Sequence, residues 1–251
     1  MLLDYPLFLF VVCLVGLWLA VRFGGWLRKK IWPVPEESEE DLNLLTGASL
    51  TLLALIIGFS FSMAVSRYDQ RKNYEEEEAN AIGTEYVRAD LLPQADAAKV
   101  RQLLIQYLDQ RLLFYTTHNM QRLAEVDTET SRLQAEMWSI VQNDAKAAPT
   151  PTMALVTAGM NDVLNRQGYT QAAWWNRIPV GGWSLMTLIA LCCCVLTGYG
   201  AHSRGPLVIT LLPFLISVSF FFIADIDSPR RGVIRVVPQN LISLSQSLHS
   251  Q

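Results

Sequence analysis

The side chains that most often perform catalysis or bind metals are not grouped in this sequence as such chemistry requires. The histidines His118, His202 and His249 are far apart, and the cysteines Cys192 to Cys194 are consecutive, so that on a helix they would point to different sides. The acidic run Glu75 to Glu78 is expected to be a solvated helical face, the alternative being a site for a divalent cation, because four consecutive side chains on a helix point in several directions. Phosphate-binding, dinucleotide-binding and hydrolase motifs do not occur. We therefore expect no catalytic residue, no cofactor and no bound metal, and the protein is not predicted to be an enzyme.

One uncharged segment suggests a different chemistry, the passage of ions. The residues that share one face of a helix in this segment are Thr51, Leu55, Phe59 and Ser62. Copies of Leu55 and Phe59 from several subunits would form a narrow apolar neck, which conducts only when it is wetted. We predict that the four residues line a pore. The alternative interpretation is an ordinary packed helix, in which Gly58 permits close contact with a neighbour.

Basic residues follow the predicted pore face along the same helix. They are Arg67, Arg71 and Lys72. Positive charges at the exit of an uncharged pore raise the local concentration of anions. The predicted conductance is therefore a passive anion conductance, with chloride as the expected ion.

The predicted pore residues must be held in place by helices that cross the membrane. The chain has four apolar segments that are each long enough to cross a bilayer. A hydrocarbon core of about 30 Å takes roughly 20 apolar residues in a helix, and backbone groups inside lipid must be satisfied within that helix. The predicted spans are residues 7–27, 44–65, 178–199 and 206–223. They explain why only 17% of the residues are charged, against roughly 25% in soluble domains. We predict an all-α, multi-pass membrane protein.

The hydrophilic segment between the second and third spans has the apolar spacing of a helical bundle. One long helix should leave the membrane after the second span and end before Pro93, and two apolar stripes at helical spacing follow it. The stripes are Val100, Leu103, Leu104, Tyr107, Leu108 and Leu112, and then Leu123, Val126, Thr130, Leu133, Met137, Ile140 and Val141. The predicted domains are a transmembrane pair at 1–66, a soluble helical domain at 67–177, a transmembrane hairpin at 178–225 and a C-terminal tail at 226–251.

The net charge argues against nucleic acid as a partner, and the distribution of basic residues predicts the orientation in the membrane. The net charge of −3 provides no basic field for nucleic acid. The distribution of lysine and arginine favours termini and central domain on the cytoplasmic side, although the cluster Arg28 to Lys30 would then lie outside.

Residues 58–72 resemble the pore helix of bestrophins. That helix has a Gly-Phe pair, then small and apolar residues, then an arginine with aromatic and acidic neighbours, as Gly58, Phe59 and Arg67 stand here. Residues 220–232 look like the bestrophin segment after the last span. Over nearly its whole length the chain is similar to a bacterial bestrophin-like group, through residues 78–93 and 227–238 in particular.

The resemblance implies an assembly and a location. It implies a homopentamer with one central pore, in which Thr51, Leu55 and Phe59 occupy the neck, in the inner (plasma) membrane of a bacterium. Its partners would be copies of the same chain, the lipid bilayer and small inorganic ions. Where calcium-gated members have an acidic clasp, this chain has Val233, Ile234 and Arg235.

Two other functions remain open from the sequence. A membrane scaffold or signalling subunit would use the helical domain to contact partners, but no kinase or HAMP-like element follows the last span. A proton-driven stator would need an acid in the middle of the membrane, and the second span offers only the hydroxyls of Ser60 and Ser62.

Overall fold

The computed structural model describes residues 5–30, 38–200 and 206–250. Within these ranges the regular elements are helices and none is a strand, which confirms the all-α fold class. The contacts divide the chain into two units. After the locations predicted from the sequence, we call Met1–Tyr68 with Arg177–Arg235 the membrane unit and Asp69–Asn176 with Val236–Gln251 the soluble unit.

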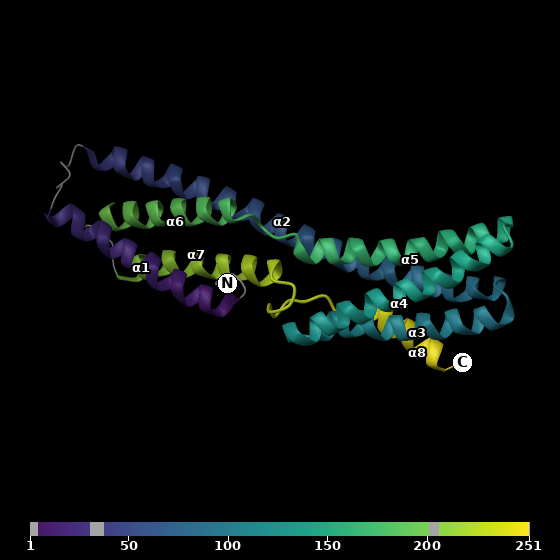
Figure 1. Cartoon of the computed structure of the whole chain (residues 1–251). Helices are drawn as coiled ribbons and strands as arrows, with labels where there is room; N and C mark the ends of the chain where they lie inside the picture. The colour runs from purple at the N-terminus through teal and green to yellow at the C-terminus, as the bar shows by residue number, and fades with distance from the viewer. Residues whose placement is uncertain (1–4, 31–37, 201–205, 251) are drawn as a thin grey trace. The chain divides into compact units, whose positions relative to one another are not determined.

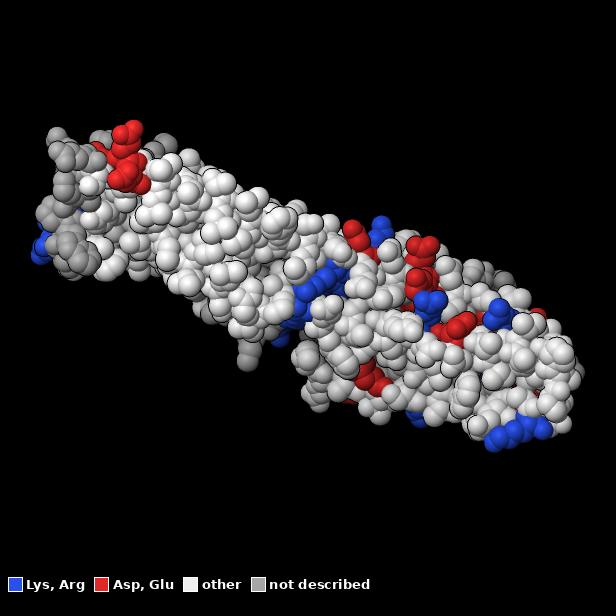
Figure 2. Space-filling view, turned by 90° about the horizontal axis from the view of Figure 1, so that it is seen from above, with Lys and Arg blue, Asp and Glu red and all other residues white. Residues whose placement is uncertain are grey.

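The membrane unit is built from helices that contain the four predicted spans. These are α1 (Pro6–Lys30), the first part of α2 (Glu39–Arg88), α6 (Val180–Gly200) and α7 (Pro206–Asp227) (Figure 1). In the described part of the chain, four helices are long and apolar enough to cross a membrane. On the face drawn in Figure 2 a broad area of this unit is free of charged side chains, as a surface in contact with lipid requires.

Glycine allows α1 and α6 to approach each other closely. A Cβ added to Gly24 of α1 would overlap the carbonyl oxygen of Val195, and one added to Gly198 of α6 would overlap the carbonyl oxygen of Val21. Small residues at a helix contact are typical of membrane bundles, where packing replaces the hydrophobic effect. α1 also packs against α7, so that it contacts both helices of the C-terminal hairpin.

The second helix continues without a break from the membrane unit into the soluble unit. α2 has 50 residues and contains no proline. It is followed by a single 3-10 turn, η3 (Ala89–Leu91), and the chain then turns at Pro93. The long helix expected from the sequence is thus present, and it ends one turn before the proline.

The soluble unit is a bundle whose core is formed by the predicted apolar stripes. Its remaining helices are α3 (Gln94–Thr116), α4 (Met120–Ala147), α5 (Pro151–Trp175) and α8 (Gln239–His249). Val100, Leu104 and Tyr107 of α3 and Leu133 and Met137 of α4 are fully buried or nearly so.

Side-chain caps begin two of these helices. The Asn119 side chain accepts hydrogen bonds from the backbone N–H groups of Gln121 and Arg122 at the start of α4. Thr150 accepts one from Met153 at the start of α5, where Pro151 occupies the first turn.

The predicted C-terminal tail contains a packed helix. α8 contacts α3, and Leu241 is fully buried. Gly83 of α2 lies under Leu244, because a Cβ at this glycine would be 3.1 Å from Leu244 Cδ1. The end of the chain, from Val236, therefore belongs to the soluble bundle.

Candidate pore-lining face of α2

The four predicted pore residues lie on one exposed face of α2 within the membrane unit. Leu55 is 54% exposed and Phe59 is 70% exposed, and Thr51 and Ser62 are also exposed. Leu53 and Ala64 on another face are buried. The periodicity thus separates a face that packs against the chain's own helices from a face that this chain leaves uncovered.

One hydroxyl on the candidate pore face is satisfied within its own helix. Thr51 Oγ1 donates to the carbonyl oxygen of Gly47 at 3.0 Å. A hydroxyl that bonds back to its own helix can face an apolar region at little cost, and its oxygen can still accept a hydrogen bond from water.

α2 is also the membrane helix that the chain covers least. In its most apolar window 11% of the residues are buried, against 28%, 33% and 44% for the other three candidate spans. An apolar surface of this kind must meet lipid or another protein.

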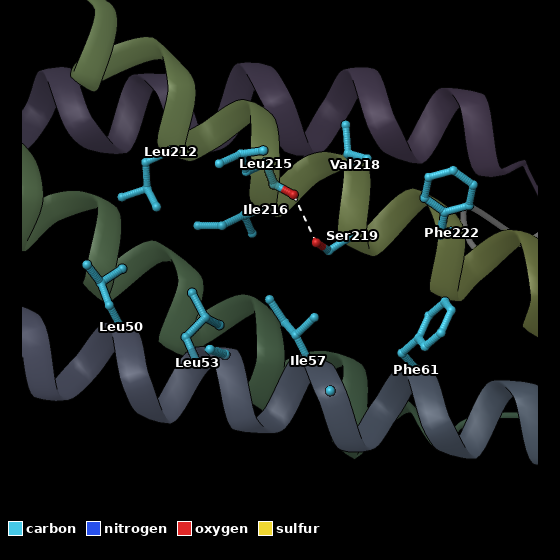
Figure 3. A pocket seen from close by; sticks show the side chains of 12 residues that line it. Leu50, Leu53, Ile57, Phe61, Leu212, Leu215, Ile216, Val218, Ser219 and Phe222 are labelled. Atoms are coloured by element: carbon cyan, nitrogen blue, oxygen red, sulfur yellow. Dashed lines mark hydrogen bonds between the residues drawn. The ribbon is translucent and has the colours of Figure 1, made fainter.

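A cavity of about 590 Å³ lies beside the candidate pore face, between α2 and α7 (Figure 3). Leu53, Ile57 and Phe61 point into it from α2, and Leu212 and Ile216 approach from α7. Its lining is almost entirely apolar, and the hydroxyl of Ser219 is satisfied by the carbonyl oxygen of Leu215 at 2.9 Å. The cavity therefore has the character of a membrane-facing groove rather than a site for a polar ligand.

The three basic residues predicted at the pore exit have different surroundings. Arg67 Nη1 forms an ion pair with Asp227 Oδ1 at 3.3 Å, and Arg71 is only 1% exposed. Lys72 is exposed. Charge neutralisation at Arg67 weakens its field on a passing ion. This partner could not be found from the sequence, because Asp227 follows Arg67 by 160 residues.

Asp227 holds more than one segment of the membrane unit. Besides pairing with Arg67, its carboxylate accepts the backbone N–H of Ile178 at 3.0 and 3.2 Å. It therefore links the end of α7 to α2 and to the chain just before α6. Hydrogen bonds to an ionised carboxylate are stronger than those between neutral groups, so Asp227 holds these three segments together firmly.

Asp225 fixes the turn that follows α7. Its two oxygens accept the backbone N–H groups of Val233 and Ile234 at 2.7 and 2.8 Å. Gly232 makes the turn possible, because a Cβ there would overlap the carbonyl oxygen of Asp225. Within the described ranges no three His, Cys, Asp or Glu side chains are grouped to hold a metal ion.

The acidic run on α2 is only in part the solvated face expected from the sequence: Glu76 is exposed, but Glu75 and Glu78 are buried. Glu75 is 1% exposed and accepts hydrogen bonds from the backbone N–H of Leu241 and the side chain of Asn240, at 2.9 and 2.6 Å. Glu78 is fully buried, pairs with Arg111 and accepts the hydroxyl of Thr170 at 3.0 Å. The expectation was wrong for Glu75 and Glu78, because their partners lie on α3, α5 and α8, where local sequence gives no sign of them.

Aromatic rings surround the buried ion pair. The Arg111 guanidinium lies 4.4 Å from the centre of the Phe114 ring, which a cation favours. Burial, and then the negative charge of Glu78, raise the pKa values of Tyr107 and Tyr115, so that both phenols stay neutral.

These features define an integral membrane protein whose uncovered second span continues into a second helical unit. The family profile of the bestrophin-like domain matches residues 8–241, and the chain belongs to the bestrophin-like family. No curated protein sequence matches it.

Solved structures share the fold over almost the full length. A bestrophin homologue from the bacterium Klebsiella pneumoniae has a TM-score of 0.65 and 15% identity, covering 97% of each chain. A single-site variant of that homologue gives 0.66 and 13%, covering 98% of this chain and 97% of the other. A structure described as a membrane protein with one substitution gives 0.67 and 14%, with the same coverage. At these identities the likeness shows the fold.

Proposed function

We propose that the protein is a passive ion channel in which the α2 helices of several identical copies surround one pore. The observation that carries the proposal is the position of Thr51, Leu55, Phe59 and Ser62 on the exposed face of the least covered span. Membership of the bestrophin-like family supports it. A homopentamer is the assembly that we propose, with Leu55 and Phe59 forming the neck.

The neck would control conduction by hydration. Rings of Leu55 and Phe59 offer no charge and no hydrogen bonds, so an ion crosses only when water fills the constriction. The hydroxyls of Thr51 and Ser62 lie on either side of it along the helix and can contact water there.

Anion selectivity is the finer part of the proposal. With Arg67 paired to Asp227 and Arg71 buried, it rests on the exposed ammonium group of Lys72. We propose chloride as the physiological ion, and a bacterial inner membrane with the termini and soluble unit on the cytoplasmic side.

Electrical recording from purified protein in a planar bilayer tests the channel. We expect currents that reverse near the chloride equilibrium potential in a salt gradient, and Lys72→Gln should move the reversal potential toward zero. Lys146→Gln, at the exposed end of α4, is the matched control and should leave it unchanged. Reversal near the cation potential would overturn anion selectivity alone, whereas silence at every voltage, ion and pH would overturn the channel.

Particle symmetry by electron microscopy tests the assembly independently. We expect five copies with the α2 helices around the axis. A particle in which α2 faces lipid or is absent from the axis would contradict the pore. A stoichiometric partner protein on silent particles would instead favour a membrane scaffold.

A further inference from the structure

A buried carboxyl group in the soluble unit has no hydrogen-bond partner. Glu85 of α2 is fully buried, and neither of its side-chain oxygens bonds to another group in the described part of the protein. Buried polar groups are nearly always paired, so an unpaired carboxyl needs a physical explanation.

The carboxyl group occupies space that a glycine provides. A Cβ added to Gly159 of α5 would overlap Glu85 Oε2 and would also lie 2.5 Å from Arg88 Nη1. Glu85 and Arg88 therefore reach the same point of α5 from successive turns of α2. Any other residue at position 159 would displace one of them.

The charges that act on Glu85 come from both helices. Burial raises its pKa from 4.5 to about 8, Arg88 on its own helix acts to lower it, and Asp162 on α5 acts to raise it. A pKa of about 8 favours the protonated, neutral carboxyl at neutral pH. A neutral carboxyl tolerates this unpaired position, whereas an ionised one does not.

A polar cavity of about 380 Å³ adjoins this contact. Its lining includes Arg88, Asn80 and Thr84 of α2 and Asp162 of α5, together with the ion pair between Glu77 and Arg166. The cavity gives the Arg88 side chain room to change position without disturbing the apolar core.

We propose that Glu85 is a proton-binding site that controls the packing of α5 against α2. In the protonated state the neutral carboxyl rests against Gly159. When the proton leaves to solvent, the carboxylate is charged and without a hydrogen-bond donor at Gly159. Glu85 then turns with the neighbouring Arg88 guanidinium into the polar cavity to form an ion pair, and the α2–α5 contact loosens around Gly159 because both side chains leave it.

The direction of the pH effect follows from linkage. Between the ordinary carboxyl pKa of 4.5 and the folded value of about 8, the folded protein binds a proton that the unfolded chain has lost. The contribution of Glu85 to stability is therefore greatest at low pH, falls as the pH rises through this window and levels off above it.

Thermal unfolding of the full chain in detergent, from about pH 5 to about pH 9, tests the proposal. We expect the wild-type Tm to fall with pH and Glu85→Gln to remove most of that slope. Glu76→Gln, an exposed position on the same helix, should keep the wild-type slope. Equal slopes in wild type and Glu85→Gln would overturn the assignment.

Two further measurements distinguish proton binding by Glu85 from a general folding defect in the Glu85→Gln variant. Carbon-13 titration of the Glu85 carboxyl in the wild-type chain should give a midpoint well above 4.5, and an ordinary midpoint would overturn the proposal. Hydrogen exchange of α5 amides near Gly159 should rise across the same pH range and stay constant in Glu85→Gln. The tests do not depend on channel activity, so a silent channel leaves them valid.

Discussion

Arg67 of α2 and Asp227 of α7 are joined at 3.3 Å, and the same carboxylate binds the backbone N–H of Ile178. Three segments that are distant in sequence therefore meet at one side chain in the membrane unit. The sequence alone predicts the positive charge of Arg67 at the pore exit. In the structure this charge is paired with Asp227 and holds the junction together.

Replacing Asp227 should separate its two roles. Asp227→Asn keeps an oxygen for Ile178 but loses the charge that holds Arg67, whereas Asp227→Ala loses both. We expect a loss of about 1–3 kcal/mol for Asn and a larger loss for Ala, because the bonds involve a charged and partly buried group. Thermal unfolding in detergent measures the difference, and unchanged stability in both variants would contradict the junction.

The buried pair of Glu78 and Arg111 should be costly to break on one side. Glu78→Gln leaves the Arg111 charge buried without its counter-ion, and we expect a loss of about 3–5 kcal/mol. The double variant Glu78→Gln, Arg111→Met should recover much of it. Glu129→Gln, which breaks an exposed pair with Arg132, is the control and should have a small effect. Equal effects of the buried and exposed changes would refute the argument.

Glu75 should determine whether α8 stays docked. Its carboxylate binds the backbone N–H of Leu241 and the side chain of Asn240, so Glu75→Ala removes both bonds at the start of this helix. We expect a loss of about 1–2 kcal/mol in local stability, seen as faster hydrogen exchange in Gln239–His249. Glu76→Ala is the matched control. Equal exchange in the two variants would show that the cap contributes little.

Phe59 and Phe61 provide a matched test of the pore face. Phe59 lies on the candidate pore face, and Phe61 lines the cavity between α2 and α7. We expect Phe59→Ala to raise single-channel conductance severalfold by widening the neck, and Phe61→Ala to leave it nearly unchanged. If only Phe61→Ala raised the conductance, the pore would face the other side of α2.

The sequence predicted those parts of the fold that depend on local pattern. The uncharged runs identified the membrane helices, and the spacing of Val100, Leu104 and Leu133 identified core positions that the structure buries. These inferences succeed because a helix repeats its faces every few residues, so that neighbours along the chain report which side is buried.

The partners of the charged residues could not be predicted in this way. Glu75 lies 166 residues from Leu241, and Glu78 lies 92 residues from Thr170. A run of four glutamates on an exposed helix has the same local sequence as one whose members reach into a bundle. The pore role of Thr51, Leu55, Phe59 and Ser62 stays a prediction, since a pore formed by several copies is absent from one chain.

The close contact between α1 and α6 at their glycines can form only late in synthesis. α1 enters the membrane early in synthesis, and the helix that fills the space beside Gly24 is translated only after the whole soluble segment. Until α6 is synthesised, α1 must therefore remain in lipid without the helix that packs against its surface at Gly24. A bulky residue at Gly24 or Gly198 would overlap the backbone of the facing helix, so it would act on this late contact between α1 and α6.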